Sequence, residues 1–95
     1  MNTIVNQEEL WNKIDRVLWK NWDPIGVNGY GGPDDEYRSY VPQIYRLLIE
    51  NEPVEGIAQK LDELARKEMG VFPNKDHSTE VAKILMATLK EHISQ

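Results

Sequence analysis

The chain contains no cysteine among its 95 residues. This absence excludes disulfide bonds, thiolate nucleophiles and metal sites built from thiolates. Long apolar runs are absent as well, since the longest uninterrupted one covers only residues 84–87, far short of the roughly 20 residues needed to cross a membrane. The first nine residues have neither the basic region nor the apolar run of a signal peptide. We therefore expect a cytoplasmic protein with no membrane association.

Positive charge is scarce relative to negative charge. Eleven Lys and Arg stand against sixteen Asp and Glu, which gives a net charge of −5. A protein whose main partner is nucleic acid needs a cationic face, so this acidic balance argues against a nucleic-acid partner. Apolar residues make up 40% of the chain and include three Trp, which is ample for one packed core. The length predicts one domain over residues 1–95.

The first amphipathic segment covers residues 7–22. Asn6 followed by Glu9 has the pattern of a capping box, and the residue before Pro24 is disfavoured in helical conformation, so Asp23 is the expected end. The spacing predicts a helix, with apolar residues recurring at three- and four-residue steps: Leu10, Trp11, Ile14, Val17, Leu18 and Trp22.

Residues 24–33 hold four of the six glycines and predict a Gly/Pro-rich loop. The second helix is expected to begin at Asp34 or Asp35 and to extend to about Asn51. Pro42 interrupts its pattern, which predicts either a kink near Ser39 or a short first turn followed by a fresh start at Pro42. The expected inward residues of this helix are Tyr37, Tyr40, Val41, Ile44, Leu47 and Leu48.

Two further helices complete the predicted fold. The third begins at Pro53 and ends at Gly70, a residue suited to a left-handed C-terminal cap. The fourth covers residues 76–92, with Asp76 or Ser78 as its cap, and its inward face extends to Ile93. Alternating β-branched runs are absent, so we predict an all-α, compact single-domain bundle of about four helices, with the Gly/Pro-rich loop between the first two.

The stretch Trp22-Asp23-Pro24-Ile25-Gly26-Val27, followed by Asp35-Glu36-Tyr37-Arg38-Ser39-Tyr40-Val41-Pro42, resembles a known group. It is similar to the YugE-like small bacterial proteins, the domain-of-unknown-function family numbered 1871. The resemblance covers most of the chain and implies a compact helical fold. It implies no activity, cofactor or catalytic residue. A second resemblance, to small proteins that carry a W-x-P-I-G motif near bacterial toxin genes, implies an immunity-type binder.

Polar and aromatic residues converge at the loop and the acidic turn that follows it. An exposed aromatic contact patch of Trp19, Tyr30 and Tyr37 is one interpretation of this region, although Trp22 is expected to plug the core and Trp19 either to border the core or to face solvent. The candidate interaction surface comprises Trp22, Asp23, Tyr30, Asp34, Asp35, Glu36, Tyr37 and Tyr40.

Candidate chemistry is weaker in the sequence than candidate binding. Asp23, Asp34, Asp35 and Glu36 offer oxygen ligands for a hard cation, but the same residue types cap and charge-complement a helix start. The loop glycines lack the lysine and the preceding strand of a phosphate-binding loop. His77 is adjacent to Ser78, and neighbouring residues at a helix start point in different directions, so a surface capping role is expected for His77. No catalytic residue, metal ligand or cofactor is assigned.

The sequence thus predicts a small cytoplasmic domain that is not an enzyme and binds another protein. An acidic surface suits a basic partner, which favours an immunity-type protein neutralising a bacterial toxin as one alternative. A metal-assisted hydrolase using Asp23, Asp35 and Glu36 is the other.

Overall fold

The computed structural model describes residues 7–23 and 37–94, and every regular element within these ranges is helical. The predicted all-α bundle of about four helices is therefore confirmed. The predicted Gly/Pro-rich loop lies outside the described residues. In chain order the elements are α1 (Gln7–Val17), the π-helical turn η1 (Leu18–Trp22), the 3-10 turn η3 (Arg38–Tyr40), α2 (Val41–Ile49), α3 (Val54–Met69) and α4 (Lys75–Ser94).

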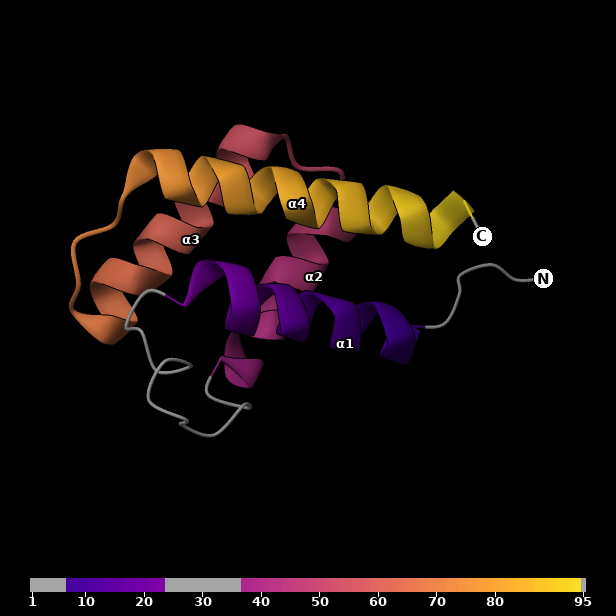
Figure 1. Cartoon of the computed structure of the whole chain (residues 1–95), viewed down its shortest axis with the longest axis horizontal. Coiled ribbons are helices and arrows are strands. Elements are labelled where there is room, and N and C mark those ends of the chain that lie inside the picture. The colour runs from indigo at the N-terminus through magenta and orange to yellow at the C-terminus, as the bar shows by residue number, and fades with distance from the viewer. Residues whose placement is uncertain (1–6, 24–36, 95) are drawn as a thin grey trace.

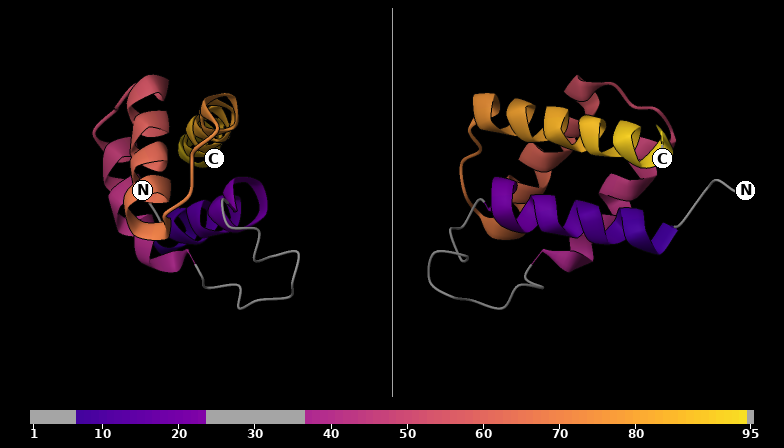
Figure 2. Two further views of the ribbon diagram at one scale, coloured as in Figure 1. Left: turned by 90° about the vertical axis from the view of Figure 1, so that its left-hand side faces the viewer. Right: turned by 45° about the vertical axis from the view of Figure 1, so that its right-hand side comes forward.

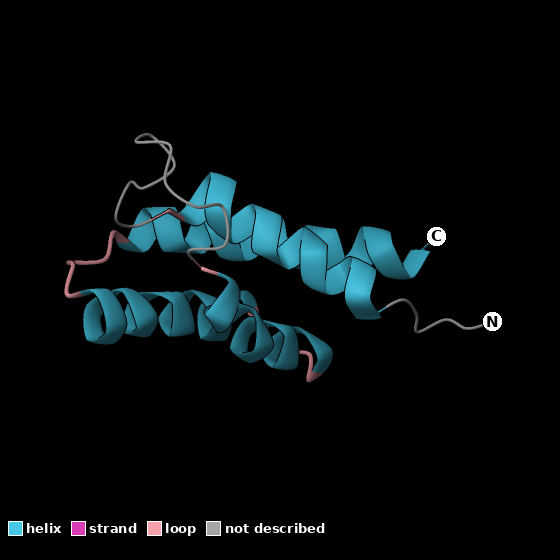
Figure 3. Ribbon diagram, turned by 90° about the horizontal axis from the view of Figure 1, so that it is seen from below, coloured by secondary structure: helices cyan, strands magenta, loops and turns pink. Residues whose placement is uncertain are grey.

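The helices form two layers. In Figure 1, α1 and α4 run in opposite directions beside each other, while α2 and α3 cross behind them. The view in Figure 2 that is turned by 90° separates the α1–α4 pair from the α2–α3 pair, and Figure 3 shows the same two layers from below. None of the described helices is long and apolar enough to cross a membrane.

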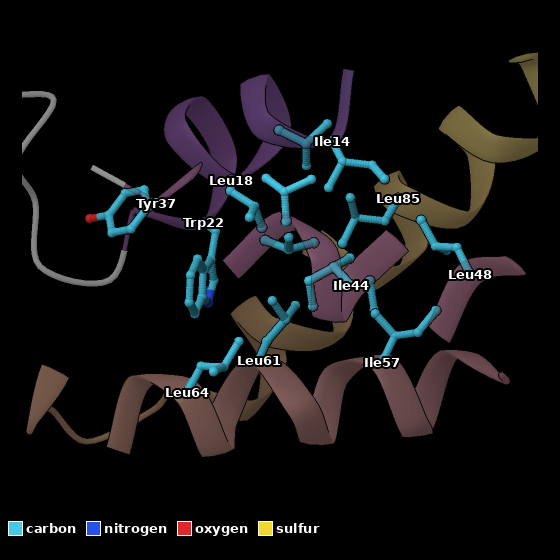
Figure 4. Packing of buried hydrophobic residues seen from close by; sticks show 14 of the residues in the cluster. Ile14, Leu18, Trp22, Tyr37, Ile44, Leu48, Ile57, Leu61, Leu64 and Leu85 are labelled. Carbon is cyan, nitrogen blue, oxygen red and sulfur yellow. The ribbon is translucent and has the colours of Figure 1, made fainter. Parts of the chain in front are cut away.

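The core lies between the layers and takes side chains from all four helices (Figure 4). Trp22 is 3% exposed and Tyr37 1% exposed, so the expectation that Trp22 plugs the core is confirmed. Ile93, predicted on the inward face, is 69% exposed because it lies in the last turn of α4, beyond the last buried residue of that helix, Leu89. Fully buried residues include Ile14, Leu18, Ile44, Leu48, Ile57, Leu61, Val81 and Leu85.

The first predicted helix ends where expected, but its last turn is wider than an α-helix. The Asp23 N–H donates to the Leu18 carbonyl oxygen at 2.9 Å, an i to i+5 bond that makes η1 a π-helical turn. Asp23 itself adopts the left-handed conformation, with φ 33° and ψ 59°. This conformation ends the helix at the residue expected from the sequence, although it is left-handed and not the extended conformation usual before proline.

The second helix is described only from its later part. The α-helix α2 starts at Val41 with Pro42 in its first turn, and the predicted start at Asp34 or Asp35 lies outside the described residues. Proline is favoured there because its missing N–H would have no partner in the helix. The short turn η3 precedes it, so of the two predicted alternatives the fresh start at Pro42 is confirmed. The helix ends at Ile49, and Asn51 turns the chain at φ 63°.

The cap of α4 was wrongly assigned by the sequence pattern. Neither Asp76 nor Ser78 caps this helix. Instead the Asn74 Oδ1 accepts a hydrogen bond from the His77 backbone N–H at 3.1 Å, the geometry of an N-terminal cap. The Ser78 hydroxyl is buried and donates to the Asp62 carboxylate on α3. Several residues in this turn have capping chemistry, and only tertiary packing selects between them.

The C-terminus of α3 follows the prediction. Gly70 has a φ of 67°, and the Val71 N–H donates to the Ala65 carbonyl oxygen at 3.1 Å. A left-handed residue without a Cβ closes a helix at little cost.

Gly70 and Gly56 allow the same substitution to be tested in opposite environments. We expect Gly70→Ala to lower the free energy of unfolding by about 1 kcal/mol, because a Cβ strains a left-handed residue. Gly56→Ala, within α3, should raise it by about 0.5 kcal/mol, because its Cβ would come too close only to the Glu52 Oε1, at the far end of a flexible side chain. Urea denaturation of both variants checks this, and equal signs would contradict it.

Candidate functional site

Four aromatic rings gather where η1 meets η3. The Trp22 ring centroid lies 5.4 Å from that of Tyr37 and 6.2 Å from that of Tyr40. Trp19 lies 6.1 Å from Tyr37. Tilted aromatic pairs at these distances contribute about 0.5–1.5 kcal/mol each beyond the area they bury. In Figure 4 the Trp22 indole points from η1 toward Leu61 and Leu64 of α3, with Tyr37 beside it. The cluster fixes the end of α1 against the rest of the bundle.

A hydrogen bond closes this cluster on its outer side. The Tyr37 hydroxyl donates to the Asp23 Oδ1 at 2.6 Å. Asp23 is half-buried and holds a left-handed backbone conformation, which costs about 1–2 kcal/mol for a residue with a Cβ. The bond from Tyr37 to a carboxylate offsets this cost. The two residues thereby fix the position at which the chain leaves η1.

The structure corrects part of the predicted interaction surface. Trp22 and Tyr37 are buried, so their rings do not form an exposed aromatic patch, because the hydrophobic effect draws them between η1 and α3. Asp23 and Tyr40 are half-buried. Trp19 is also half-buried and borders the core. The remaining predicted residues, Tyr30, Asp34, Asp35 and Glu36, lie outside the described residues.

A surface pocket opens beside the aromatic cluster. It has a volume of about 370 Å³, within the range of small-molecule and side-chain sites. The His77 Nε2 lies 3.0 Å from the Trp22 carbonyl oxygen and donates to it in the tautomer that carries the proton there. His77 therefore ties the first turn of α4 to η1. The pocket is lined by Trp22, Asp23, Ala65, Phe72, Pro73, Asn74, His77 and Ser78.

Phe72, at the rim of this pocket, is 98% exposed. A phenylalanine left almost entirely in water on the short connection between α3 and α4 contributes no core packing, unlike the other large aromatic residues described. Helical periodicity assigns no role to the residues between the third and fourth helices. The sequence signal that marks Phe72 is the pair Phe72-Pro73, an apolar ring next to a residue that stiffens the backbone.

The described residues bring together no catalytic triad and no group of three metal-ligating side chains. His77 contacts a backbone oxygen of η1, whereas the neighbouring Ser78 donates to Asp62, so the two side chains do not share a hydrogen bond. The predicted capping role of His77 is wrong, because its backbone N–H is the donor that Asn74 caps, while its ring contacts the Trp22 carbonyl oxygen. Of the three residues in the hydrolase alternative, only Asp23 is described, and it accepts a bond from Tyr37.

Among the described residues, the one carboxyl with a shifted pKa lies away from this pocket, on the outer face of α3. Hydrogen bonds from Lys67 and Lys60, both at 3.2 Å, lower the pKa of the Glu63 carboxyl below its usual range. These pairs are separated by three and four residues on an exposed helix face, the spacing of ordinary stabilising ion pairs. The shift therefore reflects helix stabilisation and does not mark a reactive group.

The chain matches no protein-family model, no curated protein and no solved structure at a significant level. The resemblance to the YugE-like proteins therefore stays a prediction.

The bond between Tyr37 and Asp23 can be measured by a double-mutant cycle. We expect Tyr37→Phe to lower the free energy of unfolding by about 1–2 kcal/mol, because it removes a hydrogen bond to a carboxylate. In an Asp23→Gly background, which keeps the left-handed turn, the same change should cost under about 0.5 kcal/mol. Urea unfolding of the four proteins gives the coupling energy. Identical costs in both backgrounds would show that the bond contributes nothing.

Proposed function

We propose that this chain is a non-catalytic, cytoplasmic protein-binding domain. Its contact surface, here called the Phe72 surface, consists of Phe72, Pro73, His77 and the rim of the pocket at Asp23. The observation that carries the proposal is the 98% exposure of Phe72 next to that pocket.

An exposed aromatic ring is a source of binding energy. Removing a phenylalanine side chain from water contributes about 1.5–3 kcal/mol, and aromatic anchors dominate the energetics of many protein interfaces. The adjacent pocket gives a partner a hollow for one of its own side chains. The exposed Phe72 ring can insert into a hollow on a partner, and the pocket beside it can accept a side chain from that partner.

The parts of this surface are held in place before any partner arrives. Asp23 is held by Tyr37, and His77 contacts the Trp22 carbonyl oxygen. Pro73 restricts the backbone next to Phe72. Preorganised contact residues lose less conformational entropy on binding. This surface is therefore suited to bind one partner specifically, even though the chain itself is small.

The charge of the chain indicates the kind of partner. A protein of net charge −5 associates faster with a basic partner, since long-range attraction steers the encounter. Neutralisation of a basic bacterial toxin would be one instance of such binding and stays a prediction.

The test compares Phe72→Ala with Ile93→Ala in affinity capture from the native cytosol, with retained proteins quantified by mass spectrometry. Loss of a central aromatic anchor costs about 2 kcal/mol or more, so we expect the specific partners of the wild type to fall at least tenfold with Phe72→Ala. They should stay unchanged with Ile93→Ala, which truncates an exposed apolar side chain at the end of α4.

Stability serves as the internal control for this comparison. Both side chains are largely exposed, so both variants should unfold within about 0.5 kcal/mol of the wild type. Partners that are retained equally by all three proteins would place the contact surface elsewhere on the chain.

A further inference from the structure

A second surface hollow, here called the Arg38 pocket, lies over α1 and η1. Its volume is about 450 Å³. Five of its residues recur at helical steps along α1 and η1, and the sixth comes from η3, a distant part of the sequence. The lining consists of Asn12, Asp15, Arg16, Trp19, Lys20 and Arg38.

The charge of this pocket is opposite to that of the whole chain. Three cationic side chains and one carboxylate give it a net charge of +2 (3 − 1), on a protein of net charge −5. Arg16 and Lys20 are exposed, and neither forms an ion pair with a residue in the ranges 7–23 and 37–93. Their charges therefore remain available to an anion that enters the pocket.

Asp15 fixes the third cation. The Arg38 Nε and Nη2 both donate to the Asp15 Oδ2 at 3.2 Å. The Asp15 side chain is only 10% exposed, whereas that of Arg38 is 58% exposed. The buried carboxylate thus holds Arg38 through two of its three nitrogens, and its Nη1 has no acceptor among the described residues. Arg38 lines the pocket, so its remaining donors are placed to serve a ligand there.

Packing does not account for Asp15. Its Oδ1 is buried and accepts no hydrogen bond from any described residue. A buried carboxylate oxygen without a donor costs stability, and such exceptions in native structures call for an explanation. Orienting Arg38 toward a ligand is a role that uses this buried charge.

We propose that the Arg38 pocket binds a phosphate monoester carried by a small aromatic molecule, such as a nucleoside monophosphate. The pocket charge of +2 complements a phosphate monoester, which carries about −1.5 to −2 near pH 7. Guanidinium groups suit phosphate because their planar donors match its oxygens in pairs.

Trp19 accounts for the aromatic part of the ligand. Its half-buried ring lines the same pocket as the three cations, and the face of an indole ring is a stacking platform for a nucleobase. It belongs to the π-helical turn η1, and such turns occur frequently at functional sites.

Titration of the full-length protein with adenosine monophosphate, followed by two-dimensional NMR at about 50 mM salt, tests the proposal. We expect saturable shifts with a Kd below about 1 mM, with the Trp19 indole N–H moving most among the three Trp. Ribose 5-phosphate should bind about tenfold more weakly for want of stacking, and adenosine at least tenfold more weakly for want of the phosphate. No saturation, or equal binding of adenosine, overturns the proposal; equal binding of ribose 5-phosphate overturns its aromatic part.

Matched substitutions distinguish binding in the pocket from a general effect of the protein's net charge. Arg16→Gln and Lys20→Gln should each weaken adenosine monophosphate binding at least fivefold without unfolding the protein, since both side chains are exposed and unpaired within the described ranges. Lys83→Gln removes the same charge from an exposed position on α4 and should change the Kd less than twofold. Equal effects at all three positions would overturn a localised site.

Asp15→Asn tests the positioning role of the buried carboxylate. If only net charge mattered, this variant would bind the nucleotide more tightly, because the pocket would gain positive charge. We expect the opposite, a loss of at least threefold, because a neutral amide holds the Arg38 guanidinium less firmly. Adenosine binding, which does not involve the phosphate, should stay unchanged. Tighter nucleotide binding would overturn the positioning role.

Discussion

The insertion of the Trp22 ring between η1, η3 and α3 is the interaction on which the rest of the structure depends. The ring is 3% exposed and contacts both Tyr37 and Tyr40. It thereby joins α1 to the segment that begins α2, across residues 24–36, without a disulfide or a metal ion in the described residues to do so. In a chain of 95 residues, the burial of one large aromatic side chain is a substantial part of the total stability.

The overall fold follows from local patterns that are legible in the sequence. Apolar residues at three- and four-residue steps predict the four helices, because each such face must be buried against another. Gly70 and Pro42 act through their own backbone chemistry, so their positions at a helix end and a helix start could be predicted. The cap of α4 could not, because Asn74, Asp76 and Ser78 have similar capping chemistry, and only the folded chain shows that Ser78 bonds to Asp62 while Asn74 binds the His77 N–H.

The candidate surfaces were less predictable, because they depend on which residues meet across the fold. The sequence placed Tyr37 both on the inward face of the second helix and in an exposed patch, and only its packing against Trp22 and its hydrogen bond to Asp23 decide for the inward position. Arg38 reaches Asp15, 23 residues earlier in the chain, and no spacing rule connects them. Phe72 appears in the sequence as one more apolar residue, and only the completed connection between α3 and α4 shows that nothing described covers it.

The π-helical turn η1 links both surfaces to the core. A π-turn places five residues where an α-helix would place about four. In η1 these residues reach three parts of the molecule: the core, the Arg38 pocket and the Phe72 surface. Leu18 and Trp22 enter the core, Trp19 and Lys20 line the Arg38 pocket, and the Trp22 carbonyl oxygen receives His77 at the Phe72 surface. A substitution of Trp22 would therefore disturb the fold and both surfaces together. Phe72 and Arg16 each belong to one surface and not to the core, so a loss of binding at either position is separable from a loss of structure.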